Sequence, residues 1–206
     1  MTAIEIIRQV QRELRLPESN SVSETHAKLI LDFLNKVQRS LMMEAAVWDE
    51  LKVYGYFNTQ AGQPNYTISI LSGGEIDVIR NLQISGASLI KKSDEEFREL
   101  KRLYTYGEPK YYRHFGKEGG DIIIEVLPVP DDIYQIDTEV LIKPPKLVND
   151  NDIPLLDHDT IILGAIMLAK REQGEDYSAE LAAFQAKLGM QADSQGESNW
   201  ADVEAV

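Results

Sequence analysis

The sequence predicts an α+β protein: a helical bundle from the N- and C-terminal helices, with an inserted, mainly antiparallel β lobe. Apolar residues recur every three or four positions near both ends of the chain, which indicates helices. Between these regions the period falls to two, and glycine and proline clusters separate short alternating runs. We therefore expect a discontinuous helical domain at residues 1–50 and 150–190, a β-rich lobe at 51–149 and an extended C-terminal tail at 191–206.

The first helical region is expected to contain two helices. A short one should span residues 3–15, and Pro17 prevents its continuation. A longer one should span residues 24–48, because no glycine or proline interrupts its apolar stripe, and Ser23 is the expected N-cap. The stripe consists of Ile30, Leu34, Val37, Leu41, Ala45 and Trp48.

The middle of the chain alternates between apolar and polar residues, which is typical of strands with one buried face. One short helix interrupts it: Ser93 can cap a helix that starts at Asp94, and Glu96 completes a capping box. This helix should carry Tyr104 on its apolar face and end at Gly107. The expected strands are residues 51–57, 66–70, 76–79, 82–84, 87–90, 111–115, 122–126 and 134–142.

The second helical region should begin at Asp157, the expected N-cap of a helix over residues 158–173. This helix is apolar nearly all round, so we expect it to be buried. Its longest apolar run has nine residues, whereas a membrane span needs about 20. A second helix should follow over residues 177–190. The tail after it is polar, acidic and aperiodic, so we expect it to be disordered in the free monomer.

The composition limits the possible chemistry. The chain has no cysteine, which excludes disulfides, thiolate metal sites and cysteine nucleophiles and suits a reducing cytoplasm. The net charge of −13 argues against tight binding to a nucleic-acid backbone, which needs clustered cations. An acidic wall would nevertheless let a duplex slide past. The simpler alternative is that the charge only keeps the chain soluble.

Candidate metal ligands gather near the second helical region. His158 lies between Asp157 and Asp159, but consecutive helical residues point about 100° apart, so these three cannot meet at one ion. The acidic run lacks the spacing and closing glutamate of an EF-hand loop. Because phosphate-binding and nucleophile-elbow motifs are also missing, we expect no catalytic residue, no cofactor and no metal site. The run consists of Asp150, Asp152, Asp157 and Asp159.

Tyrosines and cations are interleaved at residues 101–113. Bases of a single-stranded nucleic acid can stack on such tyrosines. Core tyrosines beside cations that extend to solvent produce the same pattern, and we favour that interpretation. The residues are Lys101, Arg102, Tyr104, Tyr106, Lys110, Tyr111, Tyr112 and Arg113.

Several short elements follow one another in a characteristic order. The long helix leads into an aromatic strand. A G-x-P-x-x-Y element ends at Tyr112, and a P-x-P-D-x-x-Y element runs from Pro128 to Tyr134. Pro144-Pro145, an Ile-Pro-Leu element at 153–155 and a turn at 174–177 follow. In this order the elements resemble the tailed-phage head-to-tail adaptor family, also called connector or tail tubular proteins, over roughly residues 20–190.

This resemblance implies a structural virion protein and not an enzyme. Family members form a ring, commonly of twelve copies, that joins the portal to the tail in the phage neck. The expected partners are the portal protein, downstream tail or nozzle proteins and other copies of the chain, with no membrane. Double-stranded DNA would pass through the lumen during packaging and ejection without specific binding. Assembly is expected in the host cytoplasm.

The resemblance also implies that the tail docks against the portal, because the family's C-terminal segment often does so. Such a tail would become ordered on assembly, with Trp200 as its apolar anchor. The alternative is a tail whose tryptophan makes no contact. The expected interface residues are Met190, Gln195, Asn199, Trp200, Val203 and Val206.

A different class of function stays open. The β lobe alone can serve as a small-ligand or peptide-binding module, which predicts a stable monomer with a well-formed apolar pocket.

Overall fold

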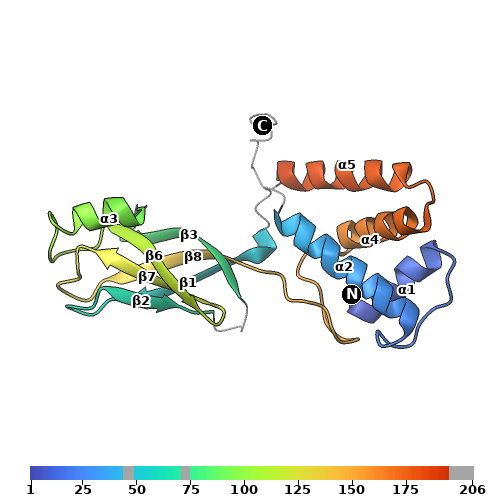
Figure 1. Cartoon of the computed structure of the whole chain (residues 1–206), viewed down its shortest axis with the longest axis horizontal. Coiled ribbons are helices and arrows are strands. Elements are labelled where there is room, and N and C mark those ends of the chain that lie inside the picture. Colours follow the sequence, from blue (N-terminus) through green and yellow to red (C-terminus); the bar gives the residue numbers. More distant parts are fainter. Residues whose placement is uncertain (44–48, 71–74, 195–206) are drawn as a thin grey trace. The chain divides into compact units, whose positions relative to one another are not determined.

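The structure, a computed structural model, describes residues 1–43, 49–70 and 75–194 (Figure 1). In this part of the chain it shows five α-helices and two four-stranded, mainly antiparallel sheets, which confirms the mixed α+β class. Backbone contacts divide the chain into two compact units. We call Met1–Leu51 with Pro144–Val206 the helical unit, and Lys52–Lys143 the β unit.

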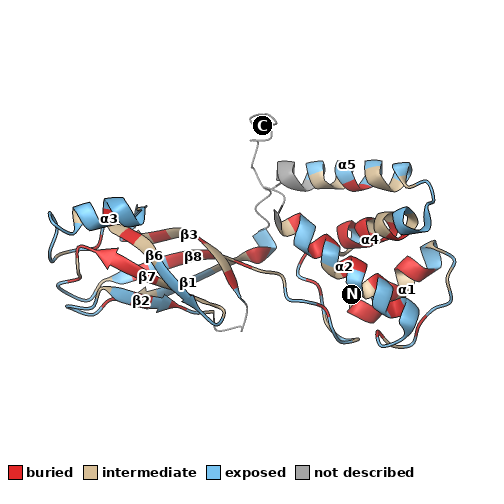
Figure 2. Ribbon diagram, viewed as in Figure 1, coloured by how far each residue is buried: buried red, intermediate tan, exposed pale blue. Residues whose placement is uncertain are grey.

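The helical unit contains α1 (Ala3–Glu13), α2 (Thr25–Met43), a 3-10 turn (Asp49–Leu51), α4 (His158–Gln173) and α5 (Ser178–Ser194). Helix α4 packs against each of the other three, and α1 also contacts α2. Buried residues run along α4, as Figure 2 shows, which confirms the expected burial of this helix. Asp157 caps it by accepting a hydrogen bond from the backbone N–H of Thr160.

The expected start of α2 and the expected end of α5 need correction. Helix α2 begins at Thr25, two residues after Ser23, so Ser23 is not its N-cap; the Ser23 hydroxyl instead donates to the hydroxyl of Ser21. Helix α5 continues to Ser194, because helix-compatible residues follow Met190 up to Gly196. The expected continuation of α2 over residues 44–48 lies outside the described residues.

Gly164 of α4 lies where three helices meet. A Cβ at this position would lie 2.7 and 2.8 Å from the two methyl carbons of Val37 and 3.1 Å from the ring of Phe184. Valine has essentially one side-chain rotamer in a helix, so Val37 cannot turn away. Glycine is therefore needed here for the close approach of α2 and α5 to α4.

We expect Gly164→Ala to lower the free energy of unfolding by about 1–3 kcal/mol through overpacking, despite the better helix propensity of alanine. Gly189→Ala is the matched control. A Cβ added to Gly189 in α5 would meet no other atom within 4 Å, so alanine should there stabilise the fold by about 0.5–1 kcal/mol. Urea denaturation measures both changes. Shifts of the same sign would contradict the packing argument.

The β unit is a sandwich of two sheets. The first sheet has the order β1-β8-β3-β4 and the second β2-β7-β6-β5, with α3 connecting the second sheet's β5 and β6. The elements are β1 (Lys52–Asn58), β2 (Asn65–Ile68), β3 (Ile76–Ile84), β4 (Ala87–Ser88), β5 (Ile90–Lys91), α3 (Asp94–Leu100), β6 (Tyr111–Glu118), β7 (Asp121–Leu127) and β8 (Gln135–Ile142).

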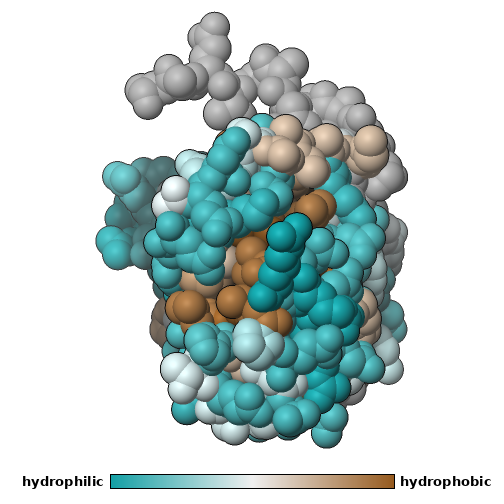
Figure 3. Space-filling model, turned by 90° about the vertical axis from the view of Figure 1, so that its right-hand side faces the viewer, coloured by the Kyte–Doolittle hydropathy of each residue, from teal (hydrophilic) through white to brown (hydrophobic). Residues whose placement is uncertain are grey.

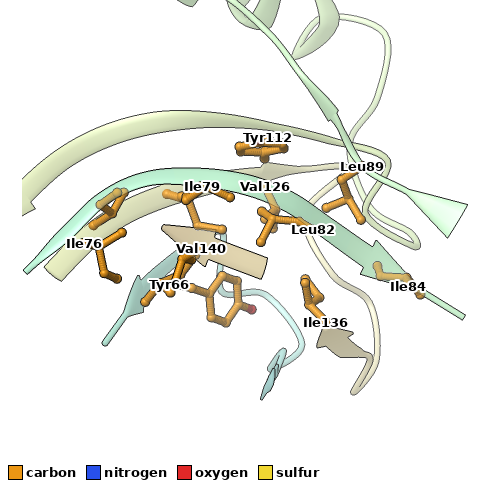
Figure 4. Close-up of a cluster of buried hydrophobic side chains, with 13 residues drawn as sticks. Tyr66, Ile76, Ile79, Leu82, Ile84, Leu89, Tyr112, Val126, Ile136 and Val140 are labelled. Atoms are coloured by element: carbon orange, nitrogen blue, oxygen red, sulfur yellow. The ribbon is translucent and has the colours of Figure 1, made fainter. Parts of the chain in front are cut away.

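One apolar core fills the space between the two sheets. Figure 4 shows side chains from both sheets, among them Val140, Leu82 and Val126, gathered in this core. Strand β8 confirms the expected alternation, since its even-numbered residues are buried and Gln135 and Asp137 are exposed. The buried positions of β8 are Ile136, Thr138, Val140 and Ile142.

The sequence was misleading at three points in the β unit. Residues 76–79 and 82–84 form one strand, β3, because irregular register around Asn81 keeps polar residues within it. Residues 87–90 do not form one strand: β4 pairs in the first sheet and β5 in the second. Helix α3 has the expected capping box but ends at Leu100, so Tyr104 is not on it.

Candidate interface surfaces

The six residues expected to dock the portal are described at one position only. Met190 lies on α5 and is 72% exposed. Gln195, Asn199, Trp200, Val203 and Val206 lie outside the described residues. Among the described residues, exposure and charge therefore identify the candidate interface surfaces.

Residues 178–190 of α5, whose side chains the structure describes, present small, uncharged residues to solvent. The charged side chains of this part turn toward α4: Lys170 binds Glu180 at 2.6 Å, and Lys187 binds Asp159 at 2.8 Å. The exposed residues that remain can approach another surface closely, and covering them desolvates no charge. They include Ala179, Ala182, Ala183, Ala186, Gly189 and Met190.

A groove of about 470 Å³ lies among α1, α4 and α5. Ile162, Leu163 and Ile166 form its apolar floor. Figure 3, in which the helical unit faces the viewer, shows hydrophobic side chains exposed between hydrophilic ones on this face. The polar residues that line the groove are Gln9, Glu13, Asp159, Lys170, Glu180 and Lys187.

The acidic residues of the linker before α4 are used in local structure. Asp150 accepts a hydrogen bond from the N–H of Val22 at 2.7 Å, and Asp152 accepts from the N–H of Val148 at 2.6 Å. Asp157 caps α4. Among the described residues no group of three or more acidic, histidine or cysteine side chains is arranged to hold a metal ion.

The ionised form of Asp157 stabilises the fold. Burial raises the pKa of Asp157, but hydrogen bonds from Thr160 and the ammonium of Lys187 outweigh burial, so the pKa lies below its ordinary value of 3.8. The backbone N–H groups of Asn149 and Val148 likewise lower the pKa of Asp152. Both carboxylates therefore contribute stability that is complete above about pH 4.

We expect this stability to be lost as the pH falls through the lowered pKa values. Asp157→Ala should cost about 1 kcal/mol at pH 6, and the difference from the unsubstituted protein should shrink toward pH 3. Thermal unfolding across this range measures the effect. Asp157→Asn keeps a capping oxygen without the charge and is the control. A difference that stays constant with pH would exclude the carboxylate charge as its cause.

The two tyrosine motifs noted in the sequence lie side by side. The N–H of Gly107 donates to the carbonyl of Val129 at 3.0 Å, and the N–H of Lys110 donates to that of Leu127 at 2.9 Å. Gly107 has φ +146°, a conformation that favours glycine. Tyr112 is buried in the core. The hydrogen bonds between the two motifs therefore stabilise the β unit.

The second motif also joins β8 to the end of β1. The hydroxyl of Tyr134 donates to Asp131 at 2.7 Å, and this hydrogen bond raises the pKa of Tyr134 to about 12. The N–H of Thr59 donates to the carbonyl of Tyr134 at 2.8 Å, and the Thr59 hydroxyl accepts from the N–H of Tyr134.

Two of the cations near the clustered tyrosines, Lys101 and Arg113, form ion pairs next to α3. Glu125 is buried and binds Arg113 at 2.6 and 2.8 Å and also Lys101. Arg113 reaches Asp94 of α3 at 2.8 Å, and its guanidinium lies 5.1 Å from the ring centre of Phe97. Two cations that could have contacted phosphates therefore attach α3 to the second sheet.

The first sheet has a polar face with two exposed tyrosines. Tyr54 and Tyr56 of β1 are 70% and 68% exposed. In the register of the sheet Tyr54 lies opposite Glu139, and Tyr56 lies opposite Asp137. Because residues opposite each other share a face, these side chains form one surface. Asn81 and Gln83 of β3 extend it around a hollow of about 390 Å³.

A larger groove, of about 710 Å³, lies between β1 and β2. These strands end the first and second sheets, so the groove opens at one side of the sandwich. Phe57 and Tyr66 meet there with ring centres 5.1 Å apart. Apolar residues dominate the lining, with Val53, Ile68, Ile70 and Val140 among them.

Neither tyrosine on β1 was singled out from the sequence as an interface residue. The alternation of the strand was visible, but it does not tell which face is covered or that β1 ends its sheet.

None of the helices in the described part of the chain is long and apolar enough to cross a bilayer.

Comparisons with known proteins identify the family of the chain. The sequence model of the family described as SU10 adaptor protein matches residues 1–204, and so extends over both units. No curated protein gives a significant match to the chain.

Proposed function

This chain belongs to the SU10 adaptor protein family, and from that premise we propose that it is a ring subunit of the phage neck that joins the portal to the tail. The family is one of structural phage adaptors, which makes the chain a virion component that interacts with portal and tail proteins in general. The match over residues 1–204 is the observation that carries the proposal.

The exposed surfaces support a protein whose work is assembly. Identical copies that pack head to tail must present two different surfaces, one for each neighbour. The helical unit offers the uncharged α5 face and the groove among α1, α4 and α5. The β unit offers the tyrosine-bearing face and the groove between β1 and β2. We propose that the ring contains twelve copies.

The proposed ring forms part of the DNA conduit for packaging and ejection. The net charge of −13 supports a lumen that repels phosphates and lets the duplex pass without specific binding. Cryo-electron microscopy of the assembled neck tests this. Carboxylates should line the lumen, and a lining mainly of lysine and arginine would exclude the proposed sliding surface.

We propose that the C-terminal tail makes the portal contact, with Met190, Gln195, Asn199, Trp200, Val203 and Val206 as interface residues. The exposure of Met190 and the uncharged face of α5 beside it support this assignment. Portal above and tail or nozzle proteins below would then hold the ring at its two ends.

Light scattering with and without portal protein tests the whole proposal. We expect a species of ring size when portal is present. A chain that stays monomeric with portal and with every other virion component would exclude the adaptor role. This mass measurement also serves as the reference for every variant described below.

One observation favours a second candidate, a peptide-binding module. The groove between β1 and β2 is apolar, and an extended peptide could add a strand at its rim. This candidate predicts a monomer that binds peptides saturably and does not change mass with portal. Hence the same light-scattering experiment distinguishes the two candidates.

A further inference from the structure

The two sides of the sandwich at which the sheets end differ in structure. On one side the segment 87–91 crosses between the sheets, so that β4 pairs with β3 and β5 pairs with β6. Leu89, between them, is only 6% exposed and donates its N–H to the carbonyl of Leu82 at 2.7 Å. This crossing segment closes that side of the core.

On the opposite side no described strand crosses between β1 and β2, and the groove of about 710 Å³ remains. Val53, Phe57 and Ile70 pack against the core there but are only partly buried. A strand placed along this groove would bury them, as Leu89 and its neighbours bury the core on the other side.

The edge of β1 that faces away from β8 has backbone groups that can pair with such a strand. The N–H of Thr59 donates to Tyr134, and backbone groups alternate in direction along an antiparallel pair. The N–H and C=O groups of Tyr54, Tyr56 and Asn58 therefore point away from β8. Strand β1 has seven residues, and Lys52 is the only charged one among them. Long edges with so few charges are normally covered in native assemblies.

The crossing segment presents a matching edge on its outer side. The N–H groups of Ile90 and Lys92 donate to the carbonyls of Lys110 and Tyr112, so the N–H of Lys91 points outward. Ile90 is 54% exposed although it is apolar. Residues 87–92 contain two lysines and no carboxylate, whereas Asp137 and Glu139 lie on the face next to β1.

We propose that the β1 edge of one copy pairs with residues 87–92 of a second copy, so that the first sheet of one protomer continues into the second sheet of the next. Ile90 then enters the groove between β1 and β2. Lys91, which points to the opposite face, lies beside the tyrosines and carboxylates of that face. Because the two edges are different surfaces, the contact is head to tail and can close a ring. The inference rests on the proposed ring function.

Cysteine crosslinking tests this contact, since the chain has no native cysteine. Tyr56→Cys combined with Lys91→Cys places the thiols on opposite sides of one sandwich, so they cannot join within a protomer. After assembly with portal and mild oxidation, we expect a ladder of covalent oligomers up to the ring. Tyr56→Cys with Glu95→Cys, which uses an exposed position on α3, is the control and should give no ladder.

Two outcomes must be kept apart. If the unsubstituted chain forms no ring with portal, the proposed function fails. If the ring forms but the Tyr56 and Lys91 thiols give no more crosslinking than the control pair, the strand-pairing proposal is wrong and the ring uses another surface.

Substitutions that spare the monomer provide a second test. Ile90→Asp should raise the concentration needed for ring formation about tenfold or more, while Leu103→Asp, at a more exposed apolar position, should not. Lys91→Glu should weaken assembly, and adding Glu139→Lys should restore it. Rings that form normally with Ile90→Asp would overturn the proposal, as would failure of the second charge reversal to restore assembly.

Discussion

Replacing Glu125 by alanine should lower the free energy of unfolding of the β unit by about 3 kcal/mol. The Glu125 side chain is 5% exposed and binds both Arg113 and Lys101. Without it, the guanidinium of Arg113, itself 16% exposed, keeps only Asp94 as a charged partner. Removing one member of a buried ion pair leaves an uncompensated charge, which costs far more than losing a surface pair. Breaking a buried ion pair costs about 3–5 kcal/mol. Because Lys101 is half-exposed, we expect a loss at the lower end of this range.

Hydrogen exchange of amides in β6 and β7 measures this loss, because both tryptophans of the chain lie outside the β unit. Glu125→Leu with Arg113→Leu is the control: replacing the pair by apolar residues should recover most of the stability. A loss below about 1 kcal/mol in the single variant would mean that water screens the cluster as it does a surface ion pair.

Ending the chain after Ser194 should abolish attachment to the portal while leaving the described fold intact. The proposed anchor, Trp200, is removed, and a single buried aromatic often carries about 2 kcal/mol or more of an interface. Trp200→Ala alone should therefore weaken attachment by about thirtyfold. Cosedimentation with portal measures attachment, and circular dichroism measures the fold.

Ser198→Ala is the matched control for the tail, since Ser198 lies in the same segment but is not a proposed contact. It should attach as the unsubstituted chain does. Normal attachment of the chain that ends at Ser194 would exclude the tail as the portal contact. In that case the uncharged α5 face becomes the surface to substitute next.

Local sequence patterns predicted the structure correctly wherever one segment determines its own structure. The capping box of Ser93 and Glu96 is present, and the cap at Asp157 forms as expected. These contacts join residues three positions apart, so a short stretch of sequence contains both partners. Strand β8 was equally clear, because its strict alternation is compatible with one buried face only.

Predictions from the sequence were wrong where distant partners decide. Residues 87–91 form one extended run, but β3 and β6 pair with different halves of it. The polar residues of β3 suggested a break, yet pairing with β8 continues across a register shift. β4 pairs with its neighbour β3, but β5 pairs with β6 beyond α3, and β3 pairs with β8 dozens of residues later in the chain. The register of such distant pairs cannot be read from the segment itself.

Patterns along the chain were therefore enough to establish the class of the fold, most of the helices and two of their caps, and the buried face of β8, because each depends on periodicity or on contacts between near neighbours. The folded structure was needed to show that β1 and β2 end their sheets, that residues 87–91 close the opposite side, and that Glu125 attaches α3 through Arg113. These features depend on which strands lie side by side. Burial and pairing of that kind arise from packing between residues far apart in the chain, and so no local pattern contains them.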